Sequence, residues 1–410
     1  MKKINFGVIG CGGRGSSMAK LLAHIDGTYV SAVCDYYEDR ANNLADAIKN
    51  EVKKDRPTPY TDADKLLESG IEAVMISTSW ETHIPLALQA MKRGIITLVE
   101  VCGTYDINDC FELVKVYEET KTPIMFLENC CYGKDELLAT ALARNGVLGK
   151  VVHCDGAYGH DLRAEITRGE ENRHYRLKHY TNYNSENYPT HELGPIAKLL
   201  GINRGNRMVS LVSMASLEAG LTAYVNSHDD INPHRIGQKF AQGDIVTTMI
   251  KCENGETITL RLDTSLPRHY NRNFTVHGTK GLYEQGCNMV FLDGMKEVFE
   301  PVEAYKMYMD NGKEYEDKYL CKEWTTITPE EIERGHGGMD AIMLADVVRR
   351  IQNGDPMSID IYDMASWIAV TALSKKSIEE GGTLQEFPDF THGEWKNRPM
   401  EDVVELPVVK

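Results

Sequence analysis

The sequence predicts an α/β protein in two parts, in which a dinucleotide-binding domain with a doubly wound parallel sheet precedes an α+β domain with an open, mainly antiparallel sheet. Two observations support this prediction. Strand-like apolar runs alternate with helical patterns in the first third of the chain, which is typical of a parallel sheet. Later strand-like runs are separated by glycine and Asn-Gly turns, which indicates antiparallel pairing. We therefore place one domain at residues 1–128 and the other at 129–410.

The first expected strand, Ile4–Ile9, leads into Gly10-Cys11-Gly12-Gly13-Arg14-Gly15 and then a helical pattern. A G-x-G-x-x-G motif between a strand and a helix is the fingerprint of a Rossmann domain. Gly10 permits the tight turn, Gly12 lets backbone amides approach a diphosphate, and Gly15 lets the helix pack on the strand. The N-terminus of that helix offers free N–H groups to phosphate oxygens.

The second expected strand, Tyr29–Asp35, ends in an acid. Asp35 lies 20 residues after Gly15, where a carboxylate binds the ribose diol of the adenosine half. A carboxylate there repels the 2′-phosphate of NADP, so we predict that the domain binds NAD. Arg14 is expected beside the diphosphate.

Three further strands, at 73–77, 97–101 and 123–129, alternate with helices at 84–93 and 108–120. Ligands of parallel α/β sheets bind at the carboxyl ends of the strands. This rule places four polar side chains on the ligand side of the sheet: His83, Glu100, Glu128 and Asn129.

The second domain begins with an expected helix at 134–145 and continues with short strands. The strands are expected at 150–158, 207–216, 245–252, 256–263, 274–278, 281–285 and 289–291. Two late helices, at 337–353 and 361–380, are expected to pack back on the core.

Residues 158–191 contain a dense group of aromatic and ionisable side chains. Long segments between regular elements are usually functional or disordered. The abundance of aromatic side chains over glycine and serine favours an ordered binding loop here. The chain has 20 tyrosines and nine phenylalanines, and flat apolar faces with hydroxyl tips suit sugar rings.

Composition argues against several other classes of protein. The 61 acidic and 45 basic residues give a net charge of −16 without a basic stripe, so we expect no nucleic-acid or membrane partner. No signal peptide or membrane-spanning helix is predicted. The ten cysteines lack C-x-x-C spacing and are expected to be reduced thiols of a cytoplasmic protein. The 13 histidines show no familiar ligand spacing, so no metal site is predicted.

Several segments together resemble glycoside hydrolase family 109, a branch of the Gfo/Idh/MocA oxidoreductase superfamily, over roughly residues 4–290. Besides the glycine motif, the resemblance is carried by Trp80-Glu81-Thr82-His83, Val99-Glu100-Val101, Leu127-Glu128-Asn129-Cys130-Cys131-Tyr132-Gly133, Ala157-Tyr158-Gly159-His160-Asp161-Leu162-Arg163, Arg176-Leu177-Lys178-His179, Tyr188-Pro189-Thr190-His191, Gly194-Pro195, Ile202-Asn203-Arg204-Gly205 and Leu211-Val212-Ser213-Met214.

The resemblance implies an NAD-dependent glycosidase, typically one acting on N-acetylgalactosamine, with tightly bound NAD that is regenerated in each cycle. Oxidation at C3 of the sugar acidifies the C2 proton, and loss of that proton expels the oxygen at C1. Water addition and re-reduction complete the cycle. NAD-dependent glycosidases depart in this way from the scheme with two carboxylates, and they need proton shuttles near C2 and C3.

The resemblance also implies roles for individual residues. His191 would take the C3 hydroxyl proton with help from Tyr188, and Tyr158 would act at C2 or share that role with His191. Glu128 would orient the sugar and leaving group, or position water. The implied substrate contacts are Tyr158, Arg176, Tyr188, His191 and Tyr270. The implied cofactor contacts are Gly10, Gly12, Gly13, Arg14, Gly15, Asp35, Trp80, His83, Glu100, Val101 and Asn129.

Two positions bear on the reaction type and the substrate. Ordinary dehydrogenases of the superfamily have a catalytic lysine where Val101 stands, and valine cannot carry a proton, which favours the glycosidase. Glu192 follows His191, where the family usually has glycine. A carboxylate there would raise the pKa of the neighbouring histidine or reshape the sugar pocket, so recognition of a 2-acetamido group stays open.

Two other functions remain as alternatives. One is an NAD-dependent sugar or cyclitol dehydrogenase that releases NADH, and the other is a non-catalytic NAD-binding sensor. The sequence does not specify the sugar, the anomer or the aglycone. We expect a small-molecule glycoside as the partner and a homo-oligomer as the assembly.

Overall fold

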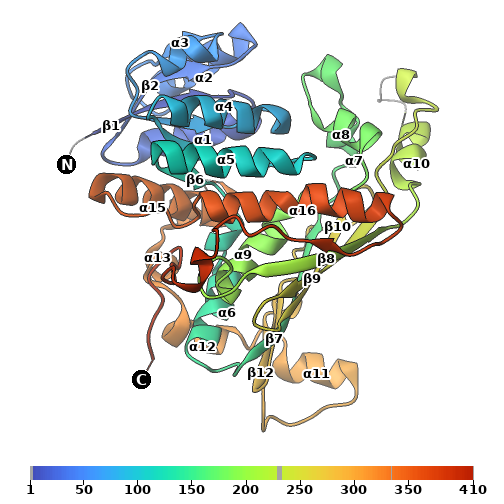
Figure 1. Cartoon of the computed structure of the whole chain (residues 1–410). Helices are drawn as coiled ribbons and strands as arrows, with labels where there is room; N and C mark the ends of the chain where they lie inside the picture. The colour runs from blue at the N-terminus through green and yellow to red at the C-terminus, as the bar shows by residue number, and fades with distance from the viewer. Residues whose placement is uncertain (1–2, 229–232, 334, 410) are drawn as a thin grey trace.

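The computed structural model describes residues 3–228, 233–333 and 335–409, and it contains two sheets from separate parts of the chain (Figure 1). The first sheet is parallel throughout, with the strand order β3-β2-β1-β4-β5-β6. Its strands are β1 (Ile4–Ile9), β2 (Thr28–Cys34), β3 (Thr58–Tyr60), β4 (Ala73–Ile76), β5 (Ile96–Val99) and β6 (Ile124–Phe126). The order reverses between β1 and β4, which is where dinucleotides bind in this fold. The predicted Rossmann domain is confirmed.

Five helices connect these strands: α1 (Gly13–His24), α2 (Glu38–Asn50), α3 (Ala63–Leu67), α4 (Trp80–Lys92) and α5 (Ile107–Thr120). Helix α4 begins four residues before the expected start at residue 84. The prediction placed Pro85 in the first turn, where proline is most easily accommodated. The helix instead buries Trp80 and His83 in its first turn and keeps Pro85 in the second.

The last parallel strand is shorter than predicted. The strand was expected to continue to Asn129, but β6 ends at Phe126 and a 3-10 segment, η1 (Asn129–Tyr132), follows. Glu128 ends the extended run because its carboxylate accepts the N–H of Cys130, 2.9 Å away. Helix α6 (Lys134–Arg144) then begins the second domain.

The second sheet has eight strands in the order β13-β12-β11-β7-β10-β9-β8-β14. All neighbours are antiparallel except β7 and β10, which run parallel, so the prediction of a mainly antiparallel sheet is confirmed. The strands are β7 (Val151–Gly159), β8 (Met208–Ala215), β9 (Ile245–Cys252), β10 (Thr257–Asp263), β11 (Thr275–Gly278), β12 (Gly281–Glu284), β13 (Met289–Leu292) and β14 (Gln385–Glu386).

The expected binding loop at 158–191 contains short helices. They are α7 (Arg163–Ile166), η2 (Glu170–Asn172), α8 (Arg176–Asn182) and the start of α9 (Thr190–Leu200). Helix α8 buries Arg176, Leu177, His179 and Tyr180. Three of these four are polar or aromatic, so the aliphatic periodicity that predicts a helix is missing.

Other helices and 3-10 segments complete the chain. They are α10 (Gly220–Ser227), η3 (Pro233–Arg235), η4 (Gln285–Cys287), α11 (Pro301–Tyr308), α12 (Lys313–Tyr319), α13 (Lys322–Thr326), α14 (Pro329–Glu333), η5 (His336–Gly338), α15 (Met339–Asn353), α16 (Ile361–Glu379) and η6 (Glu394–Lys396).

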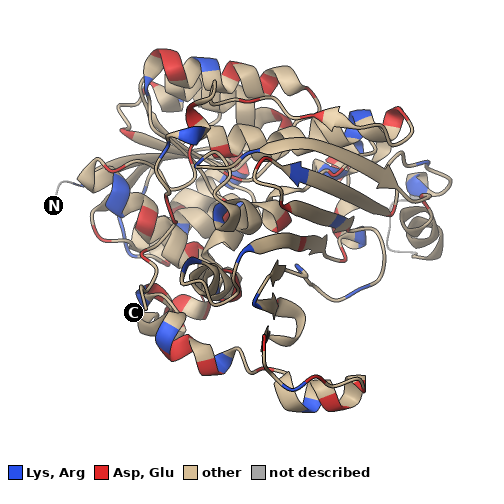
Figure 2. Cartoon of the chain, turned by 60° about the horizontal axis from the view of Figure 1, so that its bottom comes forward, with Lys and Arg blue, Asp and Glu red and all other residues tan. Residues whose placement is uncertain are grey.

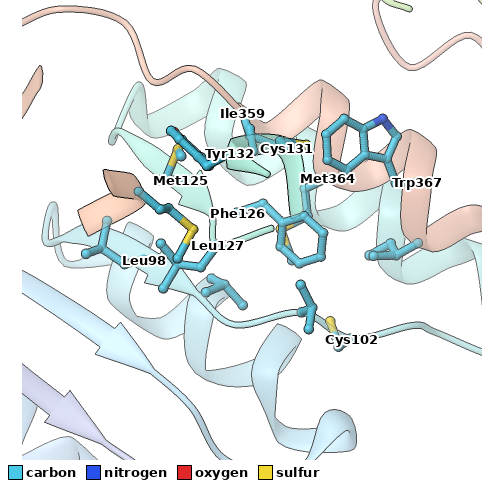
Figure 3. Packing of buried hydrophobic residues seen from close by; sticks show 14 of the residues in the cluster. Leu98, Cys102, Met125, Phe126, Leu127, Cys131, Tyr132, Ile359, Met364 and Trp367 are labelled. Carbon is cyan, nitrogen blue, oxygen red and sulfur yellow. The ribbon is translucent and has the colours of Figure 1, made fainter. Parts of the chain in front are cut away.

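The two late helices return to the core, as predicted. Helix α16 crosses the middle of the molecule in Figure 1 and packs on α5 and β6 of the first domain and on β8 of the second. Figure 3 shows Trp367 and Met364 of α16 beside Phe126, in one buried cluster with Leu127 and Ile359. The rings of Phe126 and Trp367 lie 6.3 Å apart between centroids. One apolar core therefore holds the two domains together.

Charged residues of both signs are spread along the chain (Figure 2). Across the described residues, no helix combines the length and the apolar character needed to cross a membrane. All ten cysteines are buried and free, in agreement with their interpretation as reduced thiols.

Candidate active site

Two glycines of the glycine-rich turn pack tightly against backbone atoms, and two are open to a ligand. Gly10 has a φ of +98°, and a Cβ there would lie 2.2 Å from the carbonyl oxygen of Ser77. A Cβ on Gly15 would lie 1.9 Å from the carbonyl oxygen of Gly10. At Gly12 the nearest atom would be 3.9 Å away, and at Gly13 nothing lies within 4 Å. The backbone of Gly12 and Gly13 is therefore open to a diphosphate, which is the fit that a bound dinucleotide requires.

Asp35 follows β2 and faces this turn. Its Oδ2 accepts the N–H of Cys11 at 2.7 Å, and its Oδ1 accepts the N–H of Tyr37 at 2.9 Å. Each carboxylate oxygen can accept a second hydrogen bond. Asp35 can therefore hold the glycine-rich turn and still bind a ribose diol.

Arg14 belongs to a polar network that links the two domains. Its Nε donates to Glu100 Oε1 at 2.9 Å, and its guanidinium donates to both oxygens of Asp340 at 2.5 and 3.0 Å. Asn129 Nδ2 donates to Asp340 Oδ1 at 2.8 Å. Burial opposes ionisation of Asp340, but hydrogen bonds from His336 and Arg14 outweigh it and hold the pKa of Asp340 below its usual range.

Glu100 lies deeper in the same network. Burial raises the pKa of Glu100 above its usual value, although the neighbouring Arg14 opposes this shift. Val101, the next residue, is buried and offers no polar side chain. The network thus places charged groups at the carboxyl ends of the parallel strands, with the apolar side chain of Val101 beside them.

His83 is buried in the first turn of α4 and presents an unpaired nitrogen. Its Nε2 lies 3.2 Å from the carbonyl oxygen of Thr78 and must carry the proton, because a carbonyl only accepts. Burial lowers the pKa of His83 to about 4, so the ring is neutral. Its Nδ1 has no hydrogen-bond partner in the described part of the chain, and it is available to a polar group of a bound ligand.

Tyr158, Tyr188 and His191 form a compact aromatic group. The two tyrosine rings stack with centroids 4.4 Å apart, and the His191 ring meets them edge-on at 5.3 and 4.8 Å. Tyr158 lies on β7, Tyr188 precedes α9, and His191 lies in the first turn of α9. Burial raises the pKa of both tyrosines well above the usual value, so both phenols carry their protons.

Glu128 contacts His191 directly. Its two carboxylate oxygens lie 2.8 and 2.9 Å from His191 Nδ1, and the side chain is fully buried. Burial opposes ionisation, but the adjacent His191 outweighs it and keeps the pKa of Glu128 below its usual value. A carboxylate can only accept, so Nδ1 carries the proton and Nε2 is left as the basic nitrogen. Glu128 therefore lies on the Nδ1 side of the His191 ring.

Arg176 and Tyr270 extend the aromatic group. The Arg176 guanidinium lies 4.9 Å from the Trp80 ring and 5.3 Å from the Tyr188 ring. Its Nε is 2.8 Å from Glu165 Oε1, an ion pair without hydrogen-bond geometry, and its buried Nη1 has no partner among the described residues. Tyr270 is half exposed, and its ring meets the Tyr158 ring edge-on at 6.4 Å. The five expected substrate contacts thus form one continuous group.

Glu192 bonds away from this group. Its Oε2 accepts the N–H of Arg261 on β10 at 2.8 Å, and its carboxyl lies beside that of Glu186. Burial raises the pKa of both groups, that of Glu186 to about 8. Glu186 therefore keeps its proton at neutral pH. The carboxyl of Glu192 therefore contacts β10 and Glu186 rather than the aromatic group.

Three residues of the site belong to no motif that can be recognised in the sequence. Asp340 lies 326 positions from Arg14, and Glu165 and Glu186 lie in a segment crowded with other charges. Only the packing of α15 against α1 and η1 brings Asp340 to the glycine-rich turn.

Comparison with known proteins agrees with this geometry. Residues 4–127 match the oxidoreductase family with an NAD-binding Rossmann fold, so fold and site define a protein of the NAD-binding Gfo/Idh/MocA class. Residues 132–397 match the C-terminal domain of glycosyl hydrolase 109. The chain belongs to glycoside hydrolase family 109 and is an enzyme.

Two relatives support the family assignment, and a solved structure shares the fold. An alpha-N-acetylgalactosaminidase of Tannerella forsythia is 35% identical over 96% of this chain and 88% of its own length. A glycosyl hydrolase family 109 protein of Stenotrophomonas maltophilia is 36% identical over 97% of this chain and 91% of its own. A levoglucosan dehydrogenase in complex with NADH and L-sorbose has the same fold, with a TM-score of 0.68 at 15% identity, covering 95% of this chain and 100% of that one.

Proposed function

We propose that the protein is an NAD-dependent glycosidase of the alpha-N-acetylgalactosaminidase type, which cleaves its substrate after transient oxidation at C3 of the sugar. The observation that supports this most directly is the pair formed by Glu128 and His191. It presents a basic Nε2 beside two protonated tyrosines, next to the residues expected to hold NAD. The relative from Tannerella forsythia, which carries that activity in its name, covers nearly the whole chain.

The chain's own residues fit the cofactor. The open backbone of Gly12 and Gly13 and the N-terminus of α1 would hold the diphosphate, and Asp35 would hold the adenosine ribose. Arg14, Trp80, His83, Glu100, Val101 and Asn129 would line the rest of the cofactor site. When bound, NAD supplies a reversible oxidation at C3 of the sugar and is regenerated in each cycle.

His191 would act as the base at the C3 hydroxyl. Its Nε2 takes the hydroxyl proton, and the Glu128 carboxylate stabilises the imidazolium that forms. General bases of this kind contribute about 10²–10⁴ in rate. Tyr188 assists by donating a hydrogen bond. Glu128 touches no substrate in this scheme and is a positioning residue.

Tyr158 would act at C2. Its hydroxyl lies 3.1 Å from His160 Nδ1, which is placed to accept the phenol proton. The nearby Arg176 opposes the effect of burial on the pKa of Tyr158 and stabilises the phenolate that then removes the C2 proton. The unpaired Nη1 of Arg176 would bind a sugar hydroxyl or carbonyl, with Tyr270 at the rim.

One experiment separates this function from its alternatives. The purified protein is mixed with a panel of chromogenic glycosides in deuterated water without added NAD. The proposal expects release of the aglycone, deuterium at C2 of the product and no net NADH. Steady NADH formation with excess NAD would instead identify a sugar or cyclitol dehydrogenase. Bound NAD without any turnover would identify a sensor.

We also propose a cytoplasmic location and a homo-oligomeric assembly. Ten buried free thiols agree with a reducing compartment. Light scattering during size-exclusion chromatography measures the assembly, and a monomeric mass would contradict it.

A further inference from the structure

A cluster of three potential metal ligands lies within the active site. A carboxylate oxygen of Glu128, the sulfur of Cys130 and a ring nitrogen of His191 all lie within 4.8 Å of one another. Among the described residues, these are the three His, Cys, Asp or Glu side chains whose ligand atoms lie this close together. Glu128 and Cys130 are buried, and His191 is partly exposed toward the tyrosine group.

The chemistry of the three side chains favours a thiophilic divalent cation. Carboxylate, thiolate and imidazole are all ligands of Zn²⁺, and the thiolate selects zinc or cadmium over magnesium and calcium. Ionised Glu128 and Cys130 together with neutral His191 carry two negative charges, which balance a divalent cation. Three protein ligands leave a fourth tetrahedral position for water.

The site contains a thiol proton that a cation must displace. Burial raises the pKa of Cys130 well above its usual value, although nearby Arg272 opposes this shift. The thiol donates to Asn129 Oδ1 at 3.6 Å, and the backbone N–H of Cys130 donates to Glu128. These contacts connect Glu128 and Cys130 through a short chain segment, and they orient the thiol and the carboxylate without a metal.

We propose that Glu128, Cys130 and His191 form a binding site for a thiophilic divalent cation such as Zn²⁺, which inhibits the enzyme. On binding, the sulfur–metal bond forms and the S–H bond breaks, and one proton passes to the solvent. Glu128 and His191 Nδ1 each donate a lone pair. The imidazole proton must then move from Nδ1 to Nε2, so Nε2 can no longer accept a proton from substrate. The inhibitory effect, unlike the binding, rests on the proposed role of His191.

The test titrates Cd²⁺ into the full-length, NAD-loaded enzyme and records the ultraviolet thiolate-to-cadmium charge-transfer band. One equivalent of Cd²⁺ is expected to produce the band and to release about one proton at neutral pH. Cys130→Ser removes the band. Cys131→Ser, which changes the adjacent buried cysteine outside the cluster, keeps it. Absence of the band in the wild type, or an equal band in Cys130→Ser, would overturn the site.

Inhibition is measured separately with Zn²⁺. Glycosidase turnover of the wild type is expected to fall on adding Zn²⁺ and to return on adding a chelator. Cys130→Ser keeps its basal turnover and needs at least about tenfold more Zn²⁺ for the same inhibition, because a thiolate ligand is lost. Cys130→Ala gives the same comparison if the serine variant does not fold. Cadmium binding without any glycosidase activity would refute the proposed function and leave the metal site standing.

Discussion

At the scale of single residues, the site depends on which atom each ionisable group faces. Glu128 is a buried carboxylate, and both of its oxygens face His191 Nδ1. Its position after a parallel strand places Glu128 on the ligand side of the sheet, and the family resemblance implies that it orients the sugar and leaving group or positions water. The 3-10 segment η1 turns its side chain toward α9 instead, and this changes its expected role from contacting substrate to positioning the base.

Replacing Glu128 tests that role. Glu128→Gln keeps the shape of the side chain but can donate a hydrogen bond to Nδ1, which favours the tautomer whose Nε2 is protonated. We expect kcat to fall about 100-fold, with little change in KM or in the amount of bound NAD. Glu128→Asp should recover part of the lost kcat. Steady-state kinetics and NAD content measure both effects, and an equal fall in kcat and in NAD content would point to a structural role only.

Tyr158 is tested by isotope exchange at C2. Tyr158→Phe removes the hydroxyl and keeps the stack on Tyr188, so we expect deuterium incorporation at C2 to slow about 100-fold. Tyr270→Phe is the matched control at the rim, where we expect a rise in KM of a few-fold and normal exchange at C2. Mass spectrometry of recovered sugar measures the exchange, and unchanged C2 exchange in Tyr158→Phe would exclude it as the base.

At the scale of elements, the segment between α7 and α8 bridges the two domains near Asp35. Arg173 forms an ion pair with Asp39 at 2.7 Å, and its guanidinium lies 4.2 Å from the Tyr37 ring. Arg40 Nη2 donates to the carbonyl oxygen of Arg173 at 3.3 Å. These contacts join the second domain to α2, which lies beside the expected adenosine site, so we expect them to slow the release of NAD.

Arg173→Ala therefore tests cofactor retention. The exposed ion pair and the cation–π contact each contribute little on their own, so we expect NAD to dissociate only a few-fold faster. Arg56→Ala removes another exposed ion pair, with Asp46, and should leave retention unchanged. Loss of bound NAD during repeated desalting measures the rate, and equal retention in both variants would contradict the bridge.

The buried carboxyls of Glu186 and Glu192 make the free energy of unfolding depend on pH. The unfolded chain releases these carboxyl protons near the ordinary value of 4.5, while the fold holds the pKa of Glu186 at about 8. Between pH 4.5 and about 8, the folded state therefore holds a proton on Glu186 that the unfolded chain has released. The free energy of unfolding falls as the pH rises through this range. We expect the free energy of unfolding to fall by about 1.4 kcal/mol per pH unit from this group between roughly pH 5 and 8.

Glu192→Gln should flatten that dependence. The amide is neutral and still accepts the N–H of Arg261, so no proton is needed to satisfy Glu186. We expect the variant to be more stable than the wild type at pH 8 and less sensitive to pH. Glu253→Gln, an exposed acid paired with Arg207, serves as the control. Urea unfolding across the range measures the slopes, and a wild-type slope in Glu192→Gln would exclude a contribution of Glu192 to the raised pKa of Glu186.

At the scale of the whole molecule, α16 joins the two sheets. Trp367 is fully buried between them, against Phe126 of the last parallel strand. The polar network of Arg14, Glu100, Asn129 and Asp340 forms a second link between the domains. The relative position of the base and the cofactor residues therefore depends on packing contributed by the C-terminal helices.

Trp367→Ala is expected to destabilise the whole chain by about 3–5 kcal/mol, because it removes a large side chain from a buried core. Hydrogen exchange should increase in both sheets together. Phe299→Ala removes an aromatic ring that is 88% exposed, and it should change stability by less than about 0.5 kcal/mol. Faster exchange confined to one sheet would show that the domains unfold independently.

The sequence by itself determined the local elements and the class of protein. Strand periodicity, the glycine motif and Asp35 predicted the Rossmann domain, and the seven later strand-like runs predicted the second sheet, because these signals arise from neighbours along the chain. The tertiary structure decided that Glu128 faces His191, that Asp340 closes the Arg14 network and that Glu192 pairs with Glu186. The first two contacts join residues far apart in the chain, and their approach depends on how α9 and α15 pack. An apolar period along a helix shows which face is buried but not which residues it will meet.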